Sequence, residues 1–331
     1  MTFACQQPRI ILSGYAAAPA LVGWNLQDEA AFLAAAAELP HIGGFEIPFY
    51  ASGQLHKYDG DWFLHQLRHM PADFDYVLTT IPDTMDRLVS PAFGLASKVT
   101  AGRKAALARA ASAAEAVRTL NKVLGRKAVR AVHLYSAPRL SAEDLIDTSP
   151  SSVAALTSSL QQLAEYDWDG ALPVLEHCDA TSNARLPVKG FMQFEQEIEA
   201  VVAADSGIGV SVNWARSVIE NRDTSAPQRH AERAAEARVL AGFILSGCSD
   251  RVTEFGGAWD DTHLPPAPVE SSSLLTSRHI SSIATMLEKP FPEGQAVPYR
   301  GLKVSAPAGF SVEQRVKLLA RSIDTVHGAG F

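Results

Sequence analysis

The sequence has few cysteines, no excess of positive charge and no long apolar run, and each shortage excludes a class of protein. Its three cysteines, Cys5, Cys178 and Cys248, are widely spaced and form no CxxC pair. A disulfide framework or a structural zinc knuckle is therefore not expected, and a reducing cytoplasm fits. The 29 Lys and Arg residues against 36 Asp and Glu residues give a net charge of −7, which argues against a nucleic-acid or anionic-membrane partner.

Membrane insertion and secretion are not expected either. No stretch reaches the roughly 18 uninterrupted apolar residues that a membrane span needs. The apolar segment 10–23 has the composition of a signal peptide, but Arg9 is the only charge before it, and Gly14 and Tyr15 interrupt it. We therefore expect a cytoplasmic protein whose partner is a small molecule.

The chain contains eight short apolar runs, many of them β-branched. Its 331 residues are 47% hydrophobic and 20% charged, so it can bury a large core. The apolar runs alternate with helical patterns, which is typical of βα units and a parallel sheet. Most runs are continuously apolar, as expected of strands covered on both faces. The eight expected strands span residues 9–14, 42–47, 75–81, 128–135, 171–176, 207–214, 240–246 and 299–305.

Helices are expected between these strands. Asn25 can cap a helix over residues 25–38. Eight strands, each followed by a helix or a long insertion, favour one (β/α)8 TIM-barrel domain over residues 1–331 rather than an open sheet with two unprotected edges. No glycine-rich phosphate fingerprint follows the first strand, so a dinucleotide-binding sheet is not favoured. The other expected helices span residues 103–124, 151–166, 191–204, 228–239, 272–287 and 311–327.

The carboxyl ends of the expected strands carry many ionisable side chains. A closed barrel brings these ends to one face, where active-site loops gather. The long segment 247–271 follows the seventh strand and so lies on the same face, with Asp260, Asp261 and His263. The polar residues at the strand ends are Tyr15, Glu46, Thr79, Thr80, Asp83, His133, Tyr135, Glu176, His177, Asp179, Asn213, Arg216, Ser246, Lys303 and Ser305.

Three strand-end motifs carry a resemblance to a known family. Gly44-Phe45-Glu46-Ile47, Ala131-Val132-His133 and Leu175-Glu176-His177-Cys178-Asp179 resemble the xylose isomerase-like barrels of the sugar phosphate isomerase/epimerase superfamily, in an uncharacterised bacterial branch. The resemblance implies a TIM barrel of carbohydrate metabolism that moves a proton between adjacent carbons. In that superfamily a divalent metal is held by Glu on the fifth strand, Asp on the sixth, His on the seventh and Glu on the eighth.

This chain departs from that ligand set at most positions. Only Glu176 matches; Asn213 and Arg216 stand where relatives have Asp and His, Ser246 where they have His, and Lys303 where they have Glu. A cationic side chain beside a dication would repel it. No cofactor is therefore expected. The alternative is a divalent Mn, Zn or Mg in a shifted site, with oxygen and imidazole ligands from Glu176, Asp179 and His263, or from His177.

The resemblance and the residue chemistry together assign roles. Glu176 is the expected base, with His133 or Glu46 as its acid/base partner. Lys303 and Arg216 are the expected electrophilic or anion-binding groups. The expected ligand is a small carbohydrate, acidic or phosphorylated forms included, and a homo-oligomer is compatible with the sequence. The expected substrate-binding residues are Tyr15, Asn213, Trp214, Arg216, His263 and Asp260.

Other interpretations remain open at this point. The protein can be a lyase or glycoside hydrolase that uses Glu46 and Glu176 as a carboxylate pair, or a sugar-binding barrel without catalysis. His133 can be a core histidine, and Arg216 can pair with Glu220 four residues on. Asp260 and Asp261 can be turn residues. Cys178 is better interpreted as a small buried residue than as a nucleophile, and the pair His65 and His69 is a weak metal signal.

Overall fold

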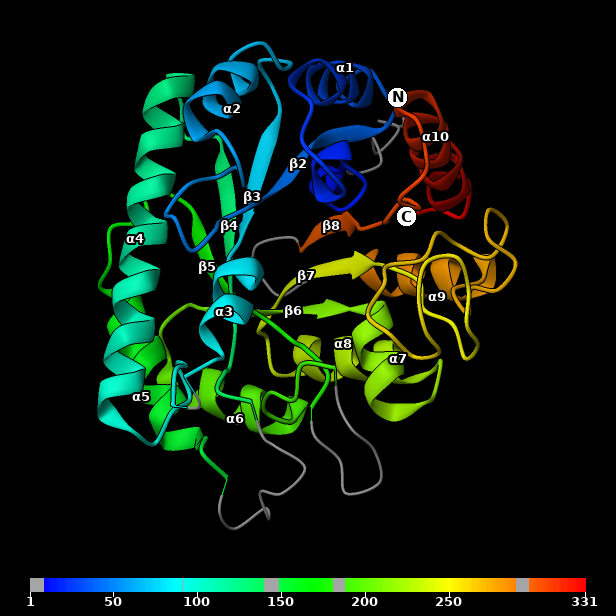
Figure 1. The fold of residues 1–331 in the computed structure, drawn as a ribbon. Coiled ribbons are helices and arrows are strands. Elements are labelled where there is room, and N and C mark those ends of the chain that lie inside the picture. The colour runs from blue at the N-terminus through cyan, green and yellow to red at the C-terminus, as the bar shows by residue number, and fades with distance from the viewer. Residues whose placement is uncertain (1–8, 91, 140–148, 181–187, 290–297) are drawn as a thin grey trace, which may run out of the picture.

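The computed structural model describes residues 9–90, 92–139, 149–180, 188–289 and 298–331. Eight parallel strands pair in chain order and close into a barrel, with the helices outside it (Figure 1). The expected (β/α)8 barrel and all eight expected strands are confirmed. The strands are β1 (Ile10–Leu12), β2 (Ile42–Pro48), β3 (Asp75–Thr79), β4 (Val129–Leu134), β5 (Leu172–Glu176), β6 (Gly209–Asn213), β7 (Leu240–Leu245) and β8 (Tyr299–Leu302).

Barrel closure depends on the pairing of β1 with β8. Ile11 faces Gly301 and Leu12 faces Leu302 across this seam. Since every neighbouring pair is parallel, all eight strands point their carboxyl ends the same way. The polar strand ends found in the sequence therefore meet at one face.

The helices surround the barrel, and α1 packs beside α10 (Figure 1). Asn25 caps α1 as expected, because its side chain accepts from the backbone N–H groups of Gln27 and Asp28. None of the helices that the structure describes combines the length and apolarity needed to cross a bilayer. The helices are α1 (Leu26–Ala37), α2 (Gly60–Leu67), α3 (Ile81–Arg87), α4 (Thr100–Leu124), α5 (Val153–Ala164), α6 (Phe194–Ala204), α7 (Trp214–Asn221), α8 (Ala226–Glu236), α9 (Ser277–Leu287) and α10 (Val312–Gly328), with short 3₁₀ turns at Gly14–Ala16 and Pro19–Leu21.

Several strand boundaries expected from the sequence are wrong: the runs 9–14 and 299–305, for example, are strands only as far as Leu12 and Leu302. The runs 75–81 and 207–214 read as single apolar segments, but the strands end at Thr79 and Asn213, and α3 and α7 begin almost at once. Asn213 caps α7 by accepting from the backbone N–H of Arg216. The apolar pattern does not mark this change from strand to helix because both elements are buried.

The barrel interior has an apolar layer below a polar one. Ile11, Val77, Ala131 and Val174 come from four strands and form one contact cluster, which requires their side chains to meet inside the barrel. Side chains two residues apart on a strand point to the same face. The next inward residue on each of these strands is polar: Ser13, Thr79, His133 and Glu176. The polar layer is thus held against a rigid apolar floor near the carboxyl face.

Gly44 sets the spacing between β2 and β3 beside this layer. Its φ is +154°, and a Cβ built on it would lie 1.6 Å from the carbonyl oxygen of Asp75 on β3. No side chain fits there. Glu46, two residues further along β2, takes its position from this close approach.

We expect Gly44→Ala to lower the free energy of unfolding by about 3 kcal/mol or more, because it adds both backbone strain and overpacking. Urea denaturation measures this change. Gly309→Ala is the control, since a Cβ at Gly309 meets nothing within 4 Å, and we expect it to change stability by less than about 0.5 kcal/mol. Equal stability of both variants would contradict the spacing argument.

Candidate active site

Glu46, His133 and Glu176 meet at the carboxyl end of the barrel. They come from β2, β4 and β5 and are 2%, 1% and 0% exposed. His133 Nδ1 lies 3.3 Å from Glu46 Oε1 and 3.4 Å from Glu176 Oε2. One ring nitrogen therefore contacts both carboxylates. The three groups form the centre of the candidate site.

Glu176 is held by three donors. Arg216 Nη1 lies 2.7 Å from its Oε1, Asn213 Nδ2 donates to the same oxygen at 3.4 Å, and the Tyr135 hydroxyl donates to Oε2. Burial alone would raise the pKa of Glu176, but Arg216 and His133 lower it to about 2. Glu176 is therefore ionised at neutral pH.

Glu46 has a second set of partners. The Ser13 hydroxyl donates to Glu46 Oε2, and Lys303 Nζ lies 3.6 Å from the same oxygen. Burial opposes ionisation, but Lys303, His133 and Ser13 bring the pKa of Glu46 well below its ordinary value. The two central carboxylates are thus each matched by a separate buried cation.

Tyr299 fixes His133 from below. Its hydroxyl is hydrogen-bonded to His133 Nε2 and lies 2.9 Å from the Ser211 hydroxyl. Tyr299 begins β8, so its side chain reaches up through the barrel. Gly242 on β7 makes room for it, since a Cβ there would lie 2.2 Å from the Tyr299 ring. With Nε2 engaged, Nδ1 is the ring atom that faces the carboxylates.

Asp261 extends the charged group outward from the barrel. Its side chain is 1% exposed, and its Oδ2 lies 3.1 Å from Arg216 Nε and 3.2 Å from Lys189 Nζ. His263 Nδ1 lies 3.3 Å from Asp261 Oδ1. Burial raises the pKa of Asp261, but His263, Arg216 and Lys189 together hold it well below its ordinary value. Arg216 is therefore bound between two carboxylates.

Several buried polar atoms in this group have ion-pair contacts but no well-aligned hydrogen bond among the residues that the structure describes. A polar ligand can supply the aligned hydrogen bonds that these atoms lack. Their convergence on one place indicates a site built for a polar ligand. These atoms are Glu46 Oε1, His133 Nδ1, Arg216 Nη1, Asp261 Oδ1 and Lys303 Nζ.

The structure brings most of the expected site residues together, but not all. Tyr15 lies in the site, with Lys303 Nζ 5.0 Å above its ring. Trp214 does not: it is buried at the start of α7, its ring 5.4 Å from that of His279 on α9. Asp260 is exposed and accepts from the backbone N–H of Gly257 in its own loop. The expected binding roles of Trp214 and Asp260 therefore lack support in the geometry.

The alternative metal set of Glu176, Asp179 and His263 is not assembled. Asp179 accepts from the backbone N–H groups of Val188 and Lys189, and His263 contacts Asp261 and Ser246. Asp179 and His263 thus have partners of their own, and among the described residues neither joins Glu176 in a cluster with the spacing of metal ligands.

His177, also considered as a metal ligand, has both ring nitrogens paired with other carboxylates. Its Nδ1 lies 2.6 Å from Glu197 and its Nε2 lies 2.8 Å from Glu220. Burial lowers the pKa of His177, but these two carboxylates raise it to about 10. The alternative pairing of Arg216 with Glu220 is not found, since Glu220 contacts His177 while Arg216 contacts Glu176 and Asp261. Cys178 is a buried free thiol whose pKa burial raises, and Cys5 lies outside the described residues.

Glu46, His133 and Glu176 do have the spacing of metal ligands. One donor atom from each lies within 4.8 Å of the others. By distance alone these three side chains can hold a divalent ion, in a different set from the one expected. The surrounding charge differs from that of a metal site, because Arg216 and Lys303 already contact the two carboxylates.

Several contributors to the site were not among the expected site residues, including Lys189 beside Asp261. Ser13 follows β1 and would have been found by the alternation of inward residues. Tyr135 stands at a strand end but was not assigned a role. Tyr299 lies at the amino end of its strand, so only its length brings it to the site. For Asp261 the sequence leaves a turn role open, because Asp commonly hydrogen-bonds its own backbone in loops.

Comparison with known proteins gives one sequence relative and a shared fold. The model of the family described as Domain of unknown function (DUF4862) matches residues 11–318. Uncharacterized protein STM3670 of Salmonella typhimurium (strain LT2) is 32% identical over 323 residues, which cover 96% of this chain and 97% of that protein.

Solved structures extend the comparison. D-psicose 3-epimerase from Clostridium cellulolyticum H10, solved with D-tagatose, superposes with a TM-score of 0.60 at 13% identity, covering 98% of this chain and 99% of that one. The IOLI protein with a binding zinc atom gives a TM-score of 0.56 at 13% identity, with coverage of 98% and 99%. The expected xylose isomerase-like fold is confirmed. By the match over residues 11–318, the chain belongs to the DUF4862 family.

Proposed function

We propose that the protein is a sugar isomerase or epimerase that moves a proton next to a sugar carbonyl without a resident metal. The observation that carries the proposal is the contact of His133 Nδ1 with both Glu46 and Glu176 at the closed end of a polar site. The fold shared with D-psicose 3-epimerase adds support, although barrels host many reactions.

Glu176 is the proposed base. In the resting protein Arg216 keeps its pKa low, whereas burial, the largest influence, raises it. A substrate oxygen that engages Arg216 Nη1 weakens the hold of Arg216 on Glu176. The carboxylate then becomes more basic in its dry surroundings when the substrate is in place.

The proton transfer balances within the site. The bond between hydrogen and the carbon next to the carbonyl breaks, and its electron pair forms a carbon–carbon double bond with negative charge on the carbonyl oxygen. Glu176 takes the proton. His133 Nδ1 contacts both carboxylates, so it can give a proton to Glu46 and take the one that Glu176 has removed. Return of a proton from Glu46 to the opposite face of the same carbon re-forms the carbonyl and gives an epimer. If the proton of the neighbouring hydroxyl first passes to the charged oxygen, return to the neighbouring carbon gives an isomer.

Arg216 and Lys303 supply the positive charge that this oxygen needs. Each has a buried nitrogen that contacts a carboxylate without a well-aligned hydrogen bond: Arg216 Nη1 lies 2.7 Å from Glu176 and Lys303 Nζ lies 3.6 Å from Glu46. Preorganised donors of this kind stabilise developing charge strongly because they are already oriented and dry. Asp261 positions Arg216 through its Nε.

The charge of the site supports catalysis without a resident metal. Glu46, Glu176 and Asp261 are contacted by Lys303, Arg216 and Lys189, so three carboxylates face three cations. A dication added here would leave an excess of two positive charges in a buried volume, which is costly. We therefore assign no reaction step to a metal.

The two rival functions fit less well. A glycoside hydrolase needs one carboxyl that is protonated before the reaction begins, but the pKa values of Glu46 and Glu176 are both lowered, whereas in the proposed reaction Glu46 receives its proton during turnover. A sugar-binding barrel without catalysis would not need buried ionisable groups with perturbed pKa values. The two lowered pKa values favour an enzyme.

The direct test is exchange of substrate hydrogen with solvent. We expect the protein to introduce deuterium next to the carbonyl of at least one free ketose or aldose in D₂O, detected by NMR. Glu176→Gln should slow this exchange by about 10²-fold or more, and the exposed Glu115→Gln should leave it unchanged. Exchange at the wild-type rate in Glu176→Gln would contradict the assignment of the base.

The cations are tested separately. Lys303→Met should reduce turnover by about 10²–10³-fold with folding intact, because Met keeps much of the packing of the Lys stem. Arg216→Lys should mainly raise KM, since a planar two-pronged contact is lost. The exposed Lys317→Met is the control. Wild-type kinetics in both site variants would show that these cations are structural.

Removal of metals tests whether the reaction proceeds without a resident metal. Protein purified without chelator should contain far less than stoichiometric Mn, Zn or Mg by elemental analysis, and dialysis against EDTA should leave its activity intact. Activity that disappears with EDTA and returns only with a divalent ion would contradict the proposal.

A further inference from the structure

Two consecutive residues at the end of β5 bind two residues of α7 that lie one helical turn apart. Glu176, the last residue of β5, contacts Arg216 at 2.7 Å, and His177, the next residue, has its Nε2 2.8 Å from Glu220 Oε2. Residues four apart lie on the same face of a helix. The two contacts therefore hold one face of α7 against β5 at two points.

His177 is the cation of the second contact. While its Nε2 engages Glu220, its Nδ1 lies 2.6 Å from Glu197 Oε2 on α6. A carboxylate oxygen only accepts, so each ring nitrogen carries a proton and the ring is an imidazolium. His177 is fully buried, and the rings of Phe194 and His230 lie 4.9 and 5.3 Å from its own. Solvent therefore screens these contacts little.

The contact with α6 extends the network to a second partner of Glu176. Glu197 Oε1 accepts from the Ser136 hydroxyl. Ser136 follows Tyr135, whose hydroxyl donates to Glu176. Of the three donors to Glu176, Tyr135 is thus next to the network in sequence, and Arg216 is one helical turn away from it.

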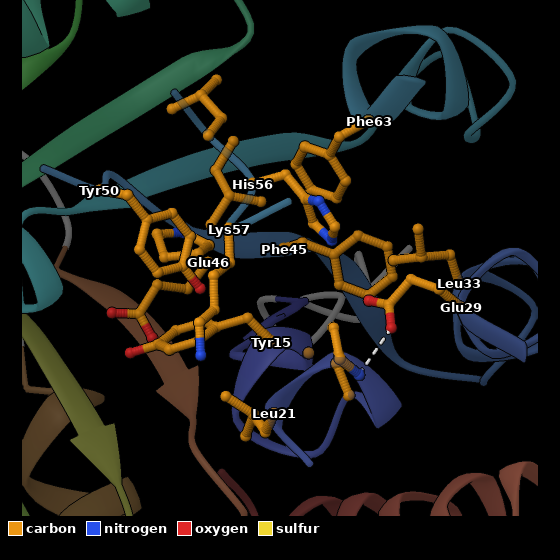
Figure 2. Close-up of a pocket in the computed structure, with 16 residues that line it drawn as sticks. Tyr15, Leu21, Glu29, Leu33, Phe45, Glu46, Tyr50, His56, Lys57 and Phe63 are labelled. Atoms are coloured by element: carbon orange, nitrogen blue, oxygen red, sulfur yellow. Dashed lines mark hydrogen bonds between the residues drawn. The ribbon is translucent and has the colours of Figure 1, made fainter. Parts of the chain in front are cut away.

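The other central carboxylate is held in a different way. Figure 2 shows Glu46 between Tyr15 and Tyr50, with further aromatic rings beyond them. The cavity left among these side chains measures about 30 Å³, which is room for one or two water molecules. Its ionic partner Lys303 and its hydroxyl donor Ser13 do not lie on α7. A change in α7 should therefore reach the Glu176 side of the site and leave Glu46 in place.

We propose that Glu220, held by the His177 imidazolium, is a positioning residue for Arg216. The inference rests on the proposed function, in which Arg216 shares its donors between Glu176 and a substrate oxygen. During that exchange the contact of Arg216 with Glu176 weakens, and α7 loses one of its two attachments to β5. The contact of Glu220 with His177 is the attachment that the substrate does not disturb, so it keeps Arg216 in place.

Solvent exchange of the Arg216 Nε–H proton tests the inference without turnover. This group donates to Asp261, and its ¹⁵N–¹H signal is assigned by its loss in Arg216→Lys. Glu220→Ala removes the acceptor for His177 and should speed the exchange by about tenfold or more. Glu220→Gln should restore slow exchange, because one amide oxygen can accept from both His177 Nε2 and the backbone N–H of Ala180, as Glu220 Oε2 does.

Two controls separate positioning from a general loss of stability. Ile323→Val leaves a small cavity under α10 and should lower the Tm without changing exchange at Arg216 Nε. Glu195→Ala removes an exposed carboxylate of α6 and should change neither. If Glu220→Ala does not fold, Glu220→Leu keeps the bulk of the side chain without its acceptor and carries the same expectation.

A double-mutant cycle extends the test to the reaction, with the ketose or aldose that the D₂O experiment identifies. Glu220→Ala should raise KM about fivefold in the wild-type background. In the Arg216→Lys background it should add little, because its effect passes through Arg216. Loss of stability alone would reduce the amount of active enzyme in both backgrounds and leave KM unchanged.

Wild-type protection of Arg216 Nε–H in both Glu220→Ala and Glu220→Leu would overturn the inference. Equal loss of protection in Ile323→Val, or additive effects on KM in the cycle, would overturn it too. The expected Arg216 pattern in a protein that labels no sugar in D₂O would refute the proposed function alone. Sugar labelling with Arg216 unaffected by Glu220→Ala would refute the positioning role alone.

Discussion

The arrangement of the site depends on one buried cation, Arg216, held between Glu176 and Asp261. Glu176 lies 2.7 Å from its Nη1 and Asp261 lies 3.1 Å from its Nε. Each carboxylate would be costly to bury alone, and a cation without partners equally so. Because Glu176 ends β5, Arg216 lies on α7 and Asp261 lies in the loop after β7, this one side chain ties three separate parts of the chain together.

The same interaction determines what chemistry the site can perform. Arg216 and Lys303 contact the two central carboxylates directly, so the protein itself places positive charge at the site. A guanidinium can share its hydrogen bonds between Glu176 and a substrate oxygen, whereas a dication would bind the carboxylate and lower its basicity. In the proposed reaction, the site holds a carboxylate ionised at rest and makes it a stronger base when a substrate arrives.

The sequence allowed the fold and the centre of the site to be predicted for a simple physical reason. Parallel strands buried on both faces are continuously apolar, so a polar residue at the end of such a run is conspicuous; Glu46, His133 and Glu176 were found in this way. Lys303 and Asn213 followed from the same rule. Barrel closure then brought these strand ends into contact.

Other contributors could not be read from the pattern. Tyr299 lies at the far end of its strand and reaches His133 only through the length of its side chain and the space left by Gly242. Asp260 and Asp261 are adjacent in a loop, and only the tertiary structure shows that Asp261 is the buried one. Trp214 follows the strand end, but the turn into α7 directs it to the outside of the barrel.

The central claim is that fixed cations occupy the electrostatic role of a metal, and anomalous diffraction tests it most directly. Crystals grown with millimolar Mn²⁺ and measured at the manganese edge would locate any ion among Glu46, His133 and Glu176. We expect no anomalous peak there, with Arg216 and Lys303 still in contact with the carboxylates. A strong peak bound by these three residues, with Arg216 or Lys303 displaced, would contradict the account.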